Sequence, residues 1–186
     1  EFDELHCARE DDGEPPPDFF AEGDSSETID AVMEALRSAG HEVKGAEGNS
    51  GFLEYLEKTR PDIVFNIAEG LTGDLREAYV PMLCERRGIP FTGSSPLTLG
   101  ICLNKARAKE ILSYYGISVS PFKTFHDDSE IDLSGLRFPL MIKPVSEGSS
   151  KGVFEDSFVE SEDEAVERIK SKIEKYRQPV IAEEFL

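Results

Sequence analysis

The segment Lys143–Gly152 holds the groups in this sequence that are best suited to binding phosphate. Gly148, Ser149 and Ser150 supply a flexible turn with backbone N–H groups and two hydroxyls, which can wrap phosphate oxygens. Lys143 ends an apolar run, so its ammonium can lie over the same phosphates. A charge pair at about 4 Å is worth about 4 kcal/mol at an effective dielectric of about 20. An ordinary hairpin turn with a solvated lysine has the same composition, and this alternative stays open.

The same segment also matches the G-x-S-x-G pattern of a hydrolase nucleophile, with Ser150 as the serine. That motif needs a strand before the serine, a helix after it, and an acid and a histidine further along the chain. Strand-like residues follow Ser150, and the histidines His6, His41 and His126 all precede it. The pattern therefore does not indicate a hydrolase. The sequence also lacks the G-x-x-x-x-G-K-[ST] and G-x-G-x-x-G fingerprints of common nucleotide-binding loops.

The chain of 186 residues has a formal charge of −18, from 38 acidic and 20 basic residues. Residues 1–30 contain twelve acidic residues and one basic residue, so they carry eleven of the eighteen net negative charges. An acidic chain has no attractive field for a phosphate backbone, which argues against nucleic-acid partners and against anionic membranes. The rest of the chain is only mildly acidic and can still contain a local cationic pocket.

The cysteines Cys7, Cys84 and Cys102 are odd in number, far apart, and form no C-x-x-C. This pattern predicts reduced thiols and argues against a zinc site. No apolar run approaches the roughly 20 residues of a membrane span, and the N-terminus shows no signal-peptide pattern. We therefore expect a cytoplasmic protein with no membrane partner.

Helical and strand-like segments alternate between residues 25 and 92. Residues 1–24 are acidic and rich in proline, and we expect them to form a loop. The alternation that follows is typical of an α/β layer fold with a mostly parallel sheet. Such a fold normally opens with a buried strand, and because the acidic loop stands in its place, we expect that strand to lie upstream in a longer protein. The expected helices are 25–39, 52–59 and 78–87, and the expected strands are 41–45, 63–67 and 89–92.

From residue 104 onward the pattern changes to that of an α+β unit. Lys105–Tyr115 is expected to be a helix closed by Gly116. Ser161 and Glu164 form a capping box that opens another helix with an apolar stripe. The chain stops directly after its last strand, which is a second indication of truncation. The expected strands are 121–125, 140–143, 153–154, 158–159 and 179–182.

Six segments form an ordered set: Asp62–Gly70, Gly88–Ser94, Leu103–Lys105, Phe138–Pro144, Glu147–Gly152 and Val180–Leu186. Each motif is weak alone, but their shared order and spacing are specific. Together they resemble the D-alanine:D-alanine ligase branch of the ATP-grasp superfamily, from about residue 25 to the end of the chain.

The resemblance implies an α/β fold in two domains. Residues 1–97 would form a preATP-grasp domain, which is Rossmann-like and has a parallel sheet. Residues 98–186 would form the central α+β subdomain of the ATP-grasp fold, which is its first ATP-binding subdomain. The C-terminal subdomain would lie downstream, so the resemblance implies a truncated fragment.

The resemblance also implies an ATP site. Lys105 and Lys143 match the two lysines that hold the ATP phosphates. Residues 147–152 match the mobile flap over the triphosphate, with Ser150 on phosphate oxygens and Ser149 nearer the reacting centre. The implied nucleotide-binding residues are Lys105, Lys143, Glu147, Ser149, Ser150, Gly152, Glu183, Glu184 and Leu186.

The end of the chain matches the part of the family that reads adenine. Glu183 falls where the family accepts the adenine amino group, and Glu184 and Leu186 fall where a backbone carbonyl and N–H read the adenine edge. These residues also have non-functional interpretations. Lys105 can be a solvated helix-start residue, and the two glutamates can belong to an ordinary acidic turn.

The sequence departs from the family at Glu69–Arg76, where the family has H-G-x-x-G-E-D-G. Glu69 replaces the histidine of a stretch that touches the first substrate. A carboxylate there suits a cationic or amine-bearing group, or it simply caps a helix. The family's substrate-side glutamate has no clear counterpart among Glu22, Asp24 and Glu27.

The family's metal ligands, an Asp and a Glu-x-Asn pair, would lie downstream of residue 186. The cofactors implied are therefore ATP and Mg²⁺, with the Mg²⁺ held outside this chain. We assign no catalytic residue, and we expect this chain by itself to be inactive.

The function implied is that of an ATP-dependent carboxylate–amine ligase that forms an amide through an acyl phosphate. Its partners would be small-molecule carboxylate and amine substrates, and the resemblance leaves room for a homodimer. The alternatives are a non-catalytic nucleotide-binding or regulatory module of the same fold, and a plain α/β interaction domain. The ligase hypothesis requires Lys105 and Lys143, distant in sequence, to meet at one cleft.

Overall fold

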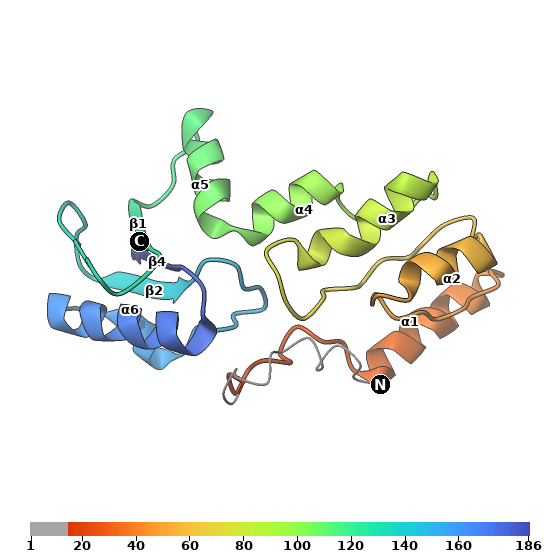
Figure 1. The fold of residues 1–186 in the computed structure, drawn as a ribbon, viewed down its shortest axis with the longest axis horizontal. Coiled ribbons are helices and arrows are strands. Elements are labelled where there is room, and N and C mark those ends of the chain that lie inside the picture. The colour runs from red at the N-terminus through yellow and green to blue at the C-terminus, as the bar shows by residue number, and fades with distance from the viewer. Residues whose placement is uncertain (1–14) are drawn as a thin grey trace. The chain divides into compact units, whose positions relative to one another are not determined.

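The computed structural model describes residues 15–186, drawn as a ribbon in Figure 1. These residues group into two units: residues 22–99 form the first, and residues 15–21 with 100–186 form the second. The division falls between residues 99 and 100, whereas the sequence placed it after residue 97. Residues 1–14 of the expected acidic loop, with His6 and Cys7, lie outside the described residues.

The helices of the first unit begin and end at the expected signals. α1 (Ser26–Ser38) starts after Ser25, whose hydroxyl accepts the N–H of Thr28 at 3.2 Å. α2 (Phe52–Thr59) ends at Arg60. A 3₁₀ turn (Arg76–Ala78) leads into α3 (Tyr79–Arg87), which Gly88 closes in a left-handed conformation. α2 and α3 bury a small core made of Phe52, Leu56, Val80, Leu83 and Cys84.

The strands expected in the first unit do not form a sheet, and this prediction was wrong. Within the described part of this unit, strand pairing is limited to one parallel bridge, between Val64 and Phe91. Residues 41–45 have no strand partner there, and Ile63 and Phe65 are 57% and 49% exposed. The parallel direction agrees with the expectation. However, a parallel pair becomes stable only when neighbouring strands and covering helices bury both of its faces, and an apolar run alone does not supply these.

α4 (Pro96–Leu103) was not expected from the sequence. Its residues are mostly apolar, so it lacks the alternation that marks an amphipathic helix. A start signal was present nevertheless. Ser95 accepts the N–H of Thr98 at 3.3 Å, and Pro96 occupies the first helical position.

The second unit contains a four-stranded antiparallel sheet in the order β1-β4-β2-β3. Its strands are β1 (Phe122–Phe125), β2 (Leu140–Pro144), β3 (Phe158–Val159) and β4 (Val180–Glu184). They confirm the expected strands, with one exception. Residues 153–154 are not a strand, because the chain turns there into a short 3₁₀ helix (Glu155–Ser157).

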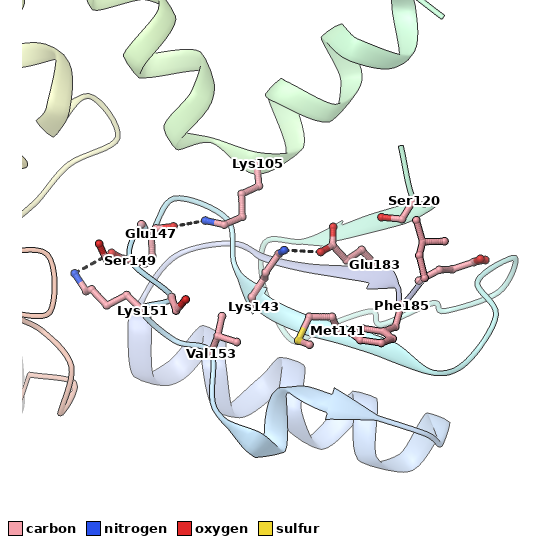
Figure 2. Close-up of a pocket in the computed structure, with 14 residues that line it drawn as sticks. Lys105, Ser120, Met141, Lys143, Glu147, Ser149, Lys151, Val153, Glu183 and Phe185 are labelled. Atoms are coloured by element: carbon pink, nitrogen blue, oxygen red, sulfur yellow. Dashed lines mark hydrogen bonds and ion pairs between the residues drawn. The ribbon is translucent and has the colours of Figure 1, made fainter. Parts of the chain in front are cut away.

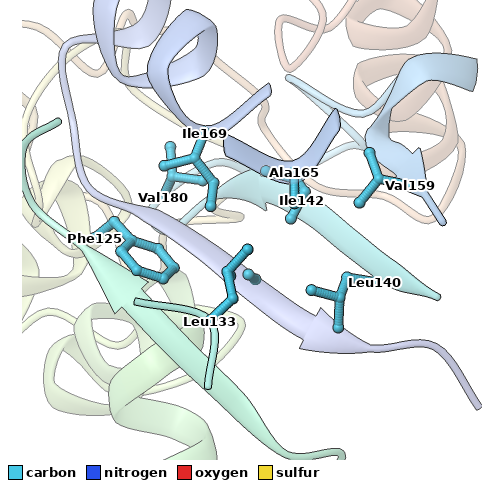
Figure 3. Packing of buried hydrophobic residues seen from close by; sticks show 9 residues of the cluster. Phe125, Leu133, Leu140, Ile142, Val159, Ala165, Ile169 and Val180 are labelled. Carbon is cyan, nitrogen blue, oxygen red and sulfur yellow. The ribbon is translucent and has the colours of Figure 1, made fainter. Parts of the chain in front are cut away.

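α6 (Glu162–Tyr176) packs along one face of this sheet (Figures 1 and 3). The expected capping box is present: Ser161 accepts the N–H of Glu164, and Glu164 accepts the N–H of Ser161. The side chains between helix and sheet form the larger core of the molecule. This cluster comprises Phe125, Leu133, Leu140, Ile142, Val159, Ala165, Ile169, Val180 and Ala182.

α5 (Lys105–Tyr114) packs against the other face through a smaller cluster, in which Ala106 contacts Val145 and Ile181, with Phe122 against them. Asn104 caps this helix by accepting the N–H of Arg107 at 3.0 Å. None of the helices in residues 15–186 is long and apolar enough to cross a membrane.

Candidate functional site

A cleft of about 530 Å³ opens on the face of the sheet opposite α6 (Figure 2). Its walls come from the start of α5, from β2, from residues 147–152, here called the glycine-rich segment, and from the end of β4. All the residues that the sequence assigned to the nucleotide site line it, except Gly152. The lining residues are Lys105, Ser120, Met141, Lys143, Glu147, Gly148, Ser149, Ser150, Lys151, Val153, Glu183, Glu184, Phe185 and Leu186.

Lys105 reaches the cleft from the first position of α5. Its ammonium donates to the backbone carbonyl of Glu147 and lies 3.4 Å from the carbonyl of Val145. Its own N–H also donates to the carbonyl of Val145 at 3.0 Å. The lysine therefore binds the start of the glycine-rich segment through both main chain and side chain.

Lys143 reaches the cleft from β2, and Figure 2 shows its side chain directed toward Glu183 on β4. The Lys143 ammonium donates to Oε1 of Glu183. A third charged group, Lys109 on α5, places its ammonium 2.8 Å from Oε2 of the same carboxylate. Burial raises the pKa of Glu183, but the two ammonium groups outweigh it and hold the pKa below the ordinary value. Glu183 is therefore ionised at neutral pH.

The glycine-rich segment is held by its own side chains. The carboxylate of Glu147 lies 2.8 Å from the ammonium of Lys151 and accepts the Nε2–H of Gln178 at 2.7 Å. Gln178 also accepts the N–H of Ser146 at 2.8 Å. The Lys151 side chain is only 3% exposed. The contacts of Glu147 with Lys151 and Gln178 thus hold the segment in its conformation.

The backbone of this segment is in unusual conformations at three residues. Ser149 and Ser150 have φ of 43° and 60°, and Gly152 has φ of 73°. Positive φ is strained for serine and tends to persist where a site needs a particular backbone shape. A Cβ at Gly152 would lie 2.4 Å from Cγ of Pro144, so glycine is required there for space as well as for φ. Gly152 supports the segment from behind and does not line the cleft.

Residues 15–21 anchor the end of the same segment. Asp18 accepts the N–H of Gly152 at 2.6 Å and the hydroxyl of Tyr176 at 2.9 Å. The Lys151 ammonium lies 5.4 Å from the ring centroid of Phe19. Burial, together with the hydrogen bond to Asp18, raises the pKa of Tyr176, so its hydroxyl remains a donor. No motif in the sequence indicates these contacts.

Glu184 points away from the cleft. Its carboxylate accepts the N–H of Arg137 at 2.9 Å and pairs with the Arg137 guanidinium at 2.8 Å. These hydrogen bonds hold the pKa of Glu184 below its ordinary value. Glu184 and Leu186 nevertheless line the cleft. The resemblance assigns main-chain contacts with adenine to these two positions.

Ser150 does not have the geometry of a hydrolase nucleophile. The residues after it form turns and the 3₁₀ helix, whereas a nucleophile elbow leads into an α-helix. Among residues 15–186, no group of three or more His, Cys, Asp or Glu side chains is arranged to hold a metal ion.

In the first unit, the stretch that departs from the family pattern forms an acidic cluster around one arginine. The Arg76 guanidinium contacts Glu22 at 2.8 Å, and both side chains are almost completely buried. Partial burial, followed by the negative charges of Glu77 and Glu22, raises the pKa of Glu69. Of the three acids considered as the substrate-side glutamate, Glu22 is therefore the one that the structure joins to this stretch.

No family model matches the chain. In sequence it is similar to an uncharacterised protein, y4sG, of Sinorhizobium fredii, with 32% identity over 179 residues that cover 92% of this chain and 51% of that protein. The D-alanine–D-alanine ligase of Haemophilus ducreyi is 32% identical over 160 residues, covering 84% and 51%. That of Aquifex aeolicus is 32% identical over 163 residues, covering 87% and 54%. The chain spans about half the length of these relatives.

Solved structures give the same relationship. A D-alanine–D-alanine ligase of Bacillus anthracis superposes with a TM-score of 0.69 at 27% identity, over 88% of this chain and 55% of that one. The same enzyme complexed with ATP gives 0.67 at 24% identity, over 88% and 56%. The VanG D-Ala:D-Ser ligase of Enterococcus faecalis gives 0.55 at 31% identity, over 67% and 36%. The mixed α/β fold and the resemblance found in the sequence are confirmed.

Proposed function

We propose that this chain, which is related to the D-alanine–D-alanine ligases of the ATP-grasp superfamily in sequence and in fold, carries part of the ATP site of a carboxylate–amine ligase. The observation that carries the proposal is the convergence of Lys105, Lys143 and the glycine-rich segment on one cleft. Lys143 and this segment are neighbours in sequence, but Lys105 precedes Lys143 by 38 positions, so its meeting with them is a property of the fold. The bland alternatives, in which each is a solvated surface group, do not account for it.

The donors around the cleft fit a nucleoside triphosphate. Lys105 and Lys143 supply positive charge, and the segment 147–152 supplies backbone N–H groups with the hydroxyls of Ser149 and Ser150. Glu183 is ionised and accepts hydrogen bonds only, which suits the amino group of adenine. Main-chain atoms of Glu184 and Leu186 complete the base-reading edge. This proposal assigns no Mg²⁺ ligand to residues 15–186.

The chemistry proposed for the whole protein is amide formation in two steps. A carboxylate oxygen takes the terminal phosphoryl group of ATP, which gives ADP and an acyl phosphate. The nitrogen of an amine then attacks the acyl carbon, phosphate leaves with the bonding electrons of the C–O bond, and the nitrogen gives up a proton to the departing phosphate. Phosphoryl transfer depends chiefly on positioning and charge stabilisation, which the two lysines supply. A closed glycine-rich segment would exclude water from the acyl phosphate.

The test uses the protein at its natural full length and the variant Lys143→Ala. ATP with magnesium raises the melting temperature of the wild type, because a ligand that binds only the folded state stabilises it by RT ln(1 + [L]/Kd). We expect Lys143→Ala to abolish this shift, since it removes a charge worth about 4 kcal/mol at about 4 Å. An unchanged shift in the variant would contradict the lysine assignment.

A second candidate is a nucleotide-binding or regulatory module without ligase activity. The observation that favours it is the buried Glu22–Arg76 pair, in which the two charges neutralise each other at the stretch where the family binds its first substrate. Amino-acid-dependent release of phosphate separates the two functions. Nucleotide binding without such release, across a panel of carboxylates and amines, would favour the module.

A further inference from the structure

We propose that Lys109 is a positioning residue for base selection, and that it keeps Glu183 oriented as an acceptor for the adenine amino group while Lys143 serves a phosphate. This inference rests on the proposed ATP site. It adds to that site a residue that neither the sequence motifs nor the resemblance assigned.

Two lysines from different elements bind the two oxygens of Glu183. Lys143 on β2 binds Oε1, and Lys109 on α5 lies 2.8 Å from Oε2. The side chains of Lys109 and Glu183 are 17% and 12% exposed, so water screens this pair only partly. Each oxygen therefore has its own cation, through a hydrogen bond from Lys143 at Oε1 and an ion pair with Lys109 at Oε2.

The two lysines differ in how firmly they are held. The Lys109 ammonium also donates to Oγ of Ser120 at 2.7 Å, and it lies 5.5 Å from the ring centroid of Phe122. Within residues 15–186, Glu183 is the sole ion-pair partner of Lys143. Lys143 can therefore turn toward a phosphate without breaking other contacts, whereas Lys109 is anchored beside β1.

This difference matters because the Glu183 side chain is only 12% exposed. Burial raises the pKa of its carboxyl, and the ammonium groups of Lys109 and Lys143 lower it. When Lys143 serves a phosphate, Lys109 is the cation that keeps Glu183 ionised. Without Lys109, burial would raise the pKa of Glu183, and a neutral carboxyl can donate as well as accept, so it would no longer select the amino group of adenine over a carbonyl oxygen.

On the described strands beside Glu183 no charged group substitutes for Lys109, and on α5 the ammonium of Lys105 donates instead to the carbonyl of Glu147. On β1, Phe122 lies opposite Glu183, and the next residue, Lys123, faces the other side of the sheet and pairs with Asp132 at 2.8 Å. On β4, the neighbouring Glu184 also faces that side, where Arg137 binds it. On β2, Met141 lies opposite Glu183 and is uncharged.

The experiment compares ATP with inosine triphosphate, which has a carbonyl oxygen in place of the adenine amino group. Affinities for both are measured with magnesium in the full-length wild type and in Lys109→Met. We expect the wild type to prefer ATP, and the variant to lose at least about tenfold of this preference, which corresponds to about 1.4 kcal/mol. Lys109→Arg should restore the preference because it keeps the charge. If Lys109→Met does not fold, Lys109→Gln, which is neutral and still donates hydrogen bonds, carries the same expectation.

Lys123→Met is the matched control. It removes a lysine from an ion pair of the same length on the opposite face of the same sheet, so it should leave the ratio of the two affinities unchanged. A general weakening of the sheet would change both lysine variants alike.

The pH dependence of the ratio separates positioning from structure. In Lys109→Met one of the two ammonium groups that lower the pKa of Glu183 is gone, so we expect the carboxyl to become neutral toward low pH and ionised toward high pH. The preference for ATP should therefore return as the pH rises, whereas in the wild type it should stay constant across the neutral range. A merely structural role would not give this profile.

The results distinguish a failure of the Lys109 assignment from a failure of the proposed ATP site. If the wild type binds neither nucleotide, the proposed ATP site fails and this inference fails with it. If the wild type prefers ATP and Lys109→Met keeps the full preference at every pH, the ATP site stands and the role of Lys109 is overturned.

Discussion

The two faces of the sheet in the second unit are built from the same strands but have different roles: one packs against α6 and the other lines the cleft. The face toward α6 carries Leu140, Ile142 and Val180, which are buried. The opposite face carries Lys143 and Glu183, which line the cleft. Side chains alternate along a strand, so a shift of one residue moves a side chain from the core to the site. Alternate residues of one strand therefore serve two purposes: one set packs against α6, and the other set lines the cleft.

Glu183 and Glu184 are adjacent in sequence, and their side chains lie on opposite faces of the sheet. Both are carboxylates with basic partners. Glu184 is joined to Arg137 on the core side, and Glu183 is joined to lysines at the cleft. Residue type alone does not distinguish a structural acid from a functional one, whereas the direction of the side chain does.

The largest effect on stability is expected on the core face. Ile169 on α6 is completely buried in the main cluster. Ile169→Ala should lower the free energy of unfolding by about 2–5 kcal/mol, because it removes buried methylene groups and leaves a cavity. Urea unfolding measures this loss, and Ile117→Ala, at a position that is 53% exposed, serves as the control.

The comparison of faces also predicts that folded Ile169→Ala keeps its nucleotide affinity. A loss of affinity in the folded variant at low temperature would show that the two faces are not independent.

Gly152→Ala should have an effect of comparable size, and it would act on the boundary between the faces. Its Cβ would meet Pro144 at 2.4 Å, and its φ is +73°. We expect a loss of about 1–3 kcal/mol from the strained φ, with a further about 1–3 kcal/mol from the overlap. Gly135→Ala isolates the first contribution, because its φ is +84° and its Cβ would meet no atom within 4 Å. Equal losses in the two variants would mean that the approach of Pro144 is not limiting.

Asp18→Ala should have the smallest effect, about 1–3 kcal/mol. It leaves the N–H of Gly152 and the hydroxyl of Tyr176 without their acceptor, and the loss depends on how well water replaces it. Hydrogen exchange of the Gly152 amide should become faster, which measures the freedom of the glycine-rich segment directly. Asp18→Asn keeps an acceptor oxygen, so its exchange rate at the Gly152 amide should lie between those of the wild type and Asp18→Ala. Unchanged exchange in Asp18→Ala would show that residues 15–21 do not anchor the segment.

Several elements could be predicted from the sequence because their signals are local. The caps at Ser25 and Ser161, the closing Gly88 and the strand β2 follow from residues within one turn or one strand of each other. That the described part of the first unit has one parallel bridge in place of a sheet could not be predicted in this way. An apolar run such as residues 63–67 is compatible with a strand, but pairing needs partners that the run does not specify.

For the candidate site, the sequence identified the groups that motif order marks, including Lys105, Lys143 and Glu183. It missed Lys109, although that residue stands one helical turn after Lys105 and so faces the same side of α5. It also missed Gln178 and Lys151, which hold the glycine-rich segment. These residues have no motif of their own, and only their contacts reveal them.

The sequence by itself determined the local structure of the second unit, the alternation of its strands, and the residue types able to hold a triphosphate. The tertiary structure alone decided which of these groups meet. Asp18 binds Gly152 from 134 positions away, and Lys143 binds Glu183 from 40 positions away. The physical reason is that helix caps and strand alternation depend on neighbours along the chain, whereas such pairs depend on strand order and packing, which no short stretch of sequence encodes.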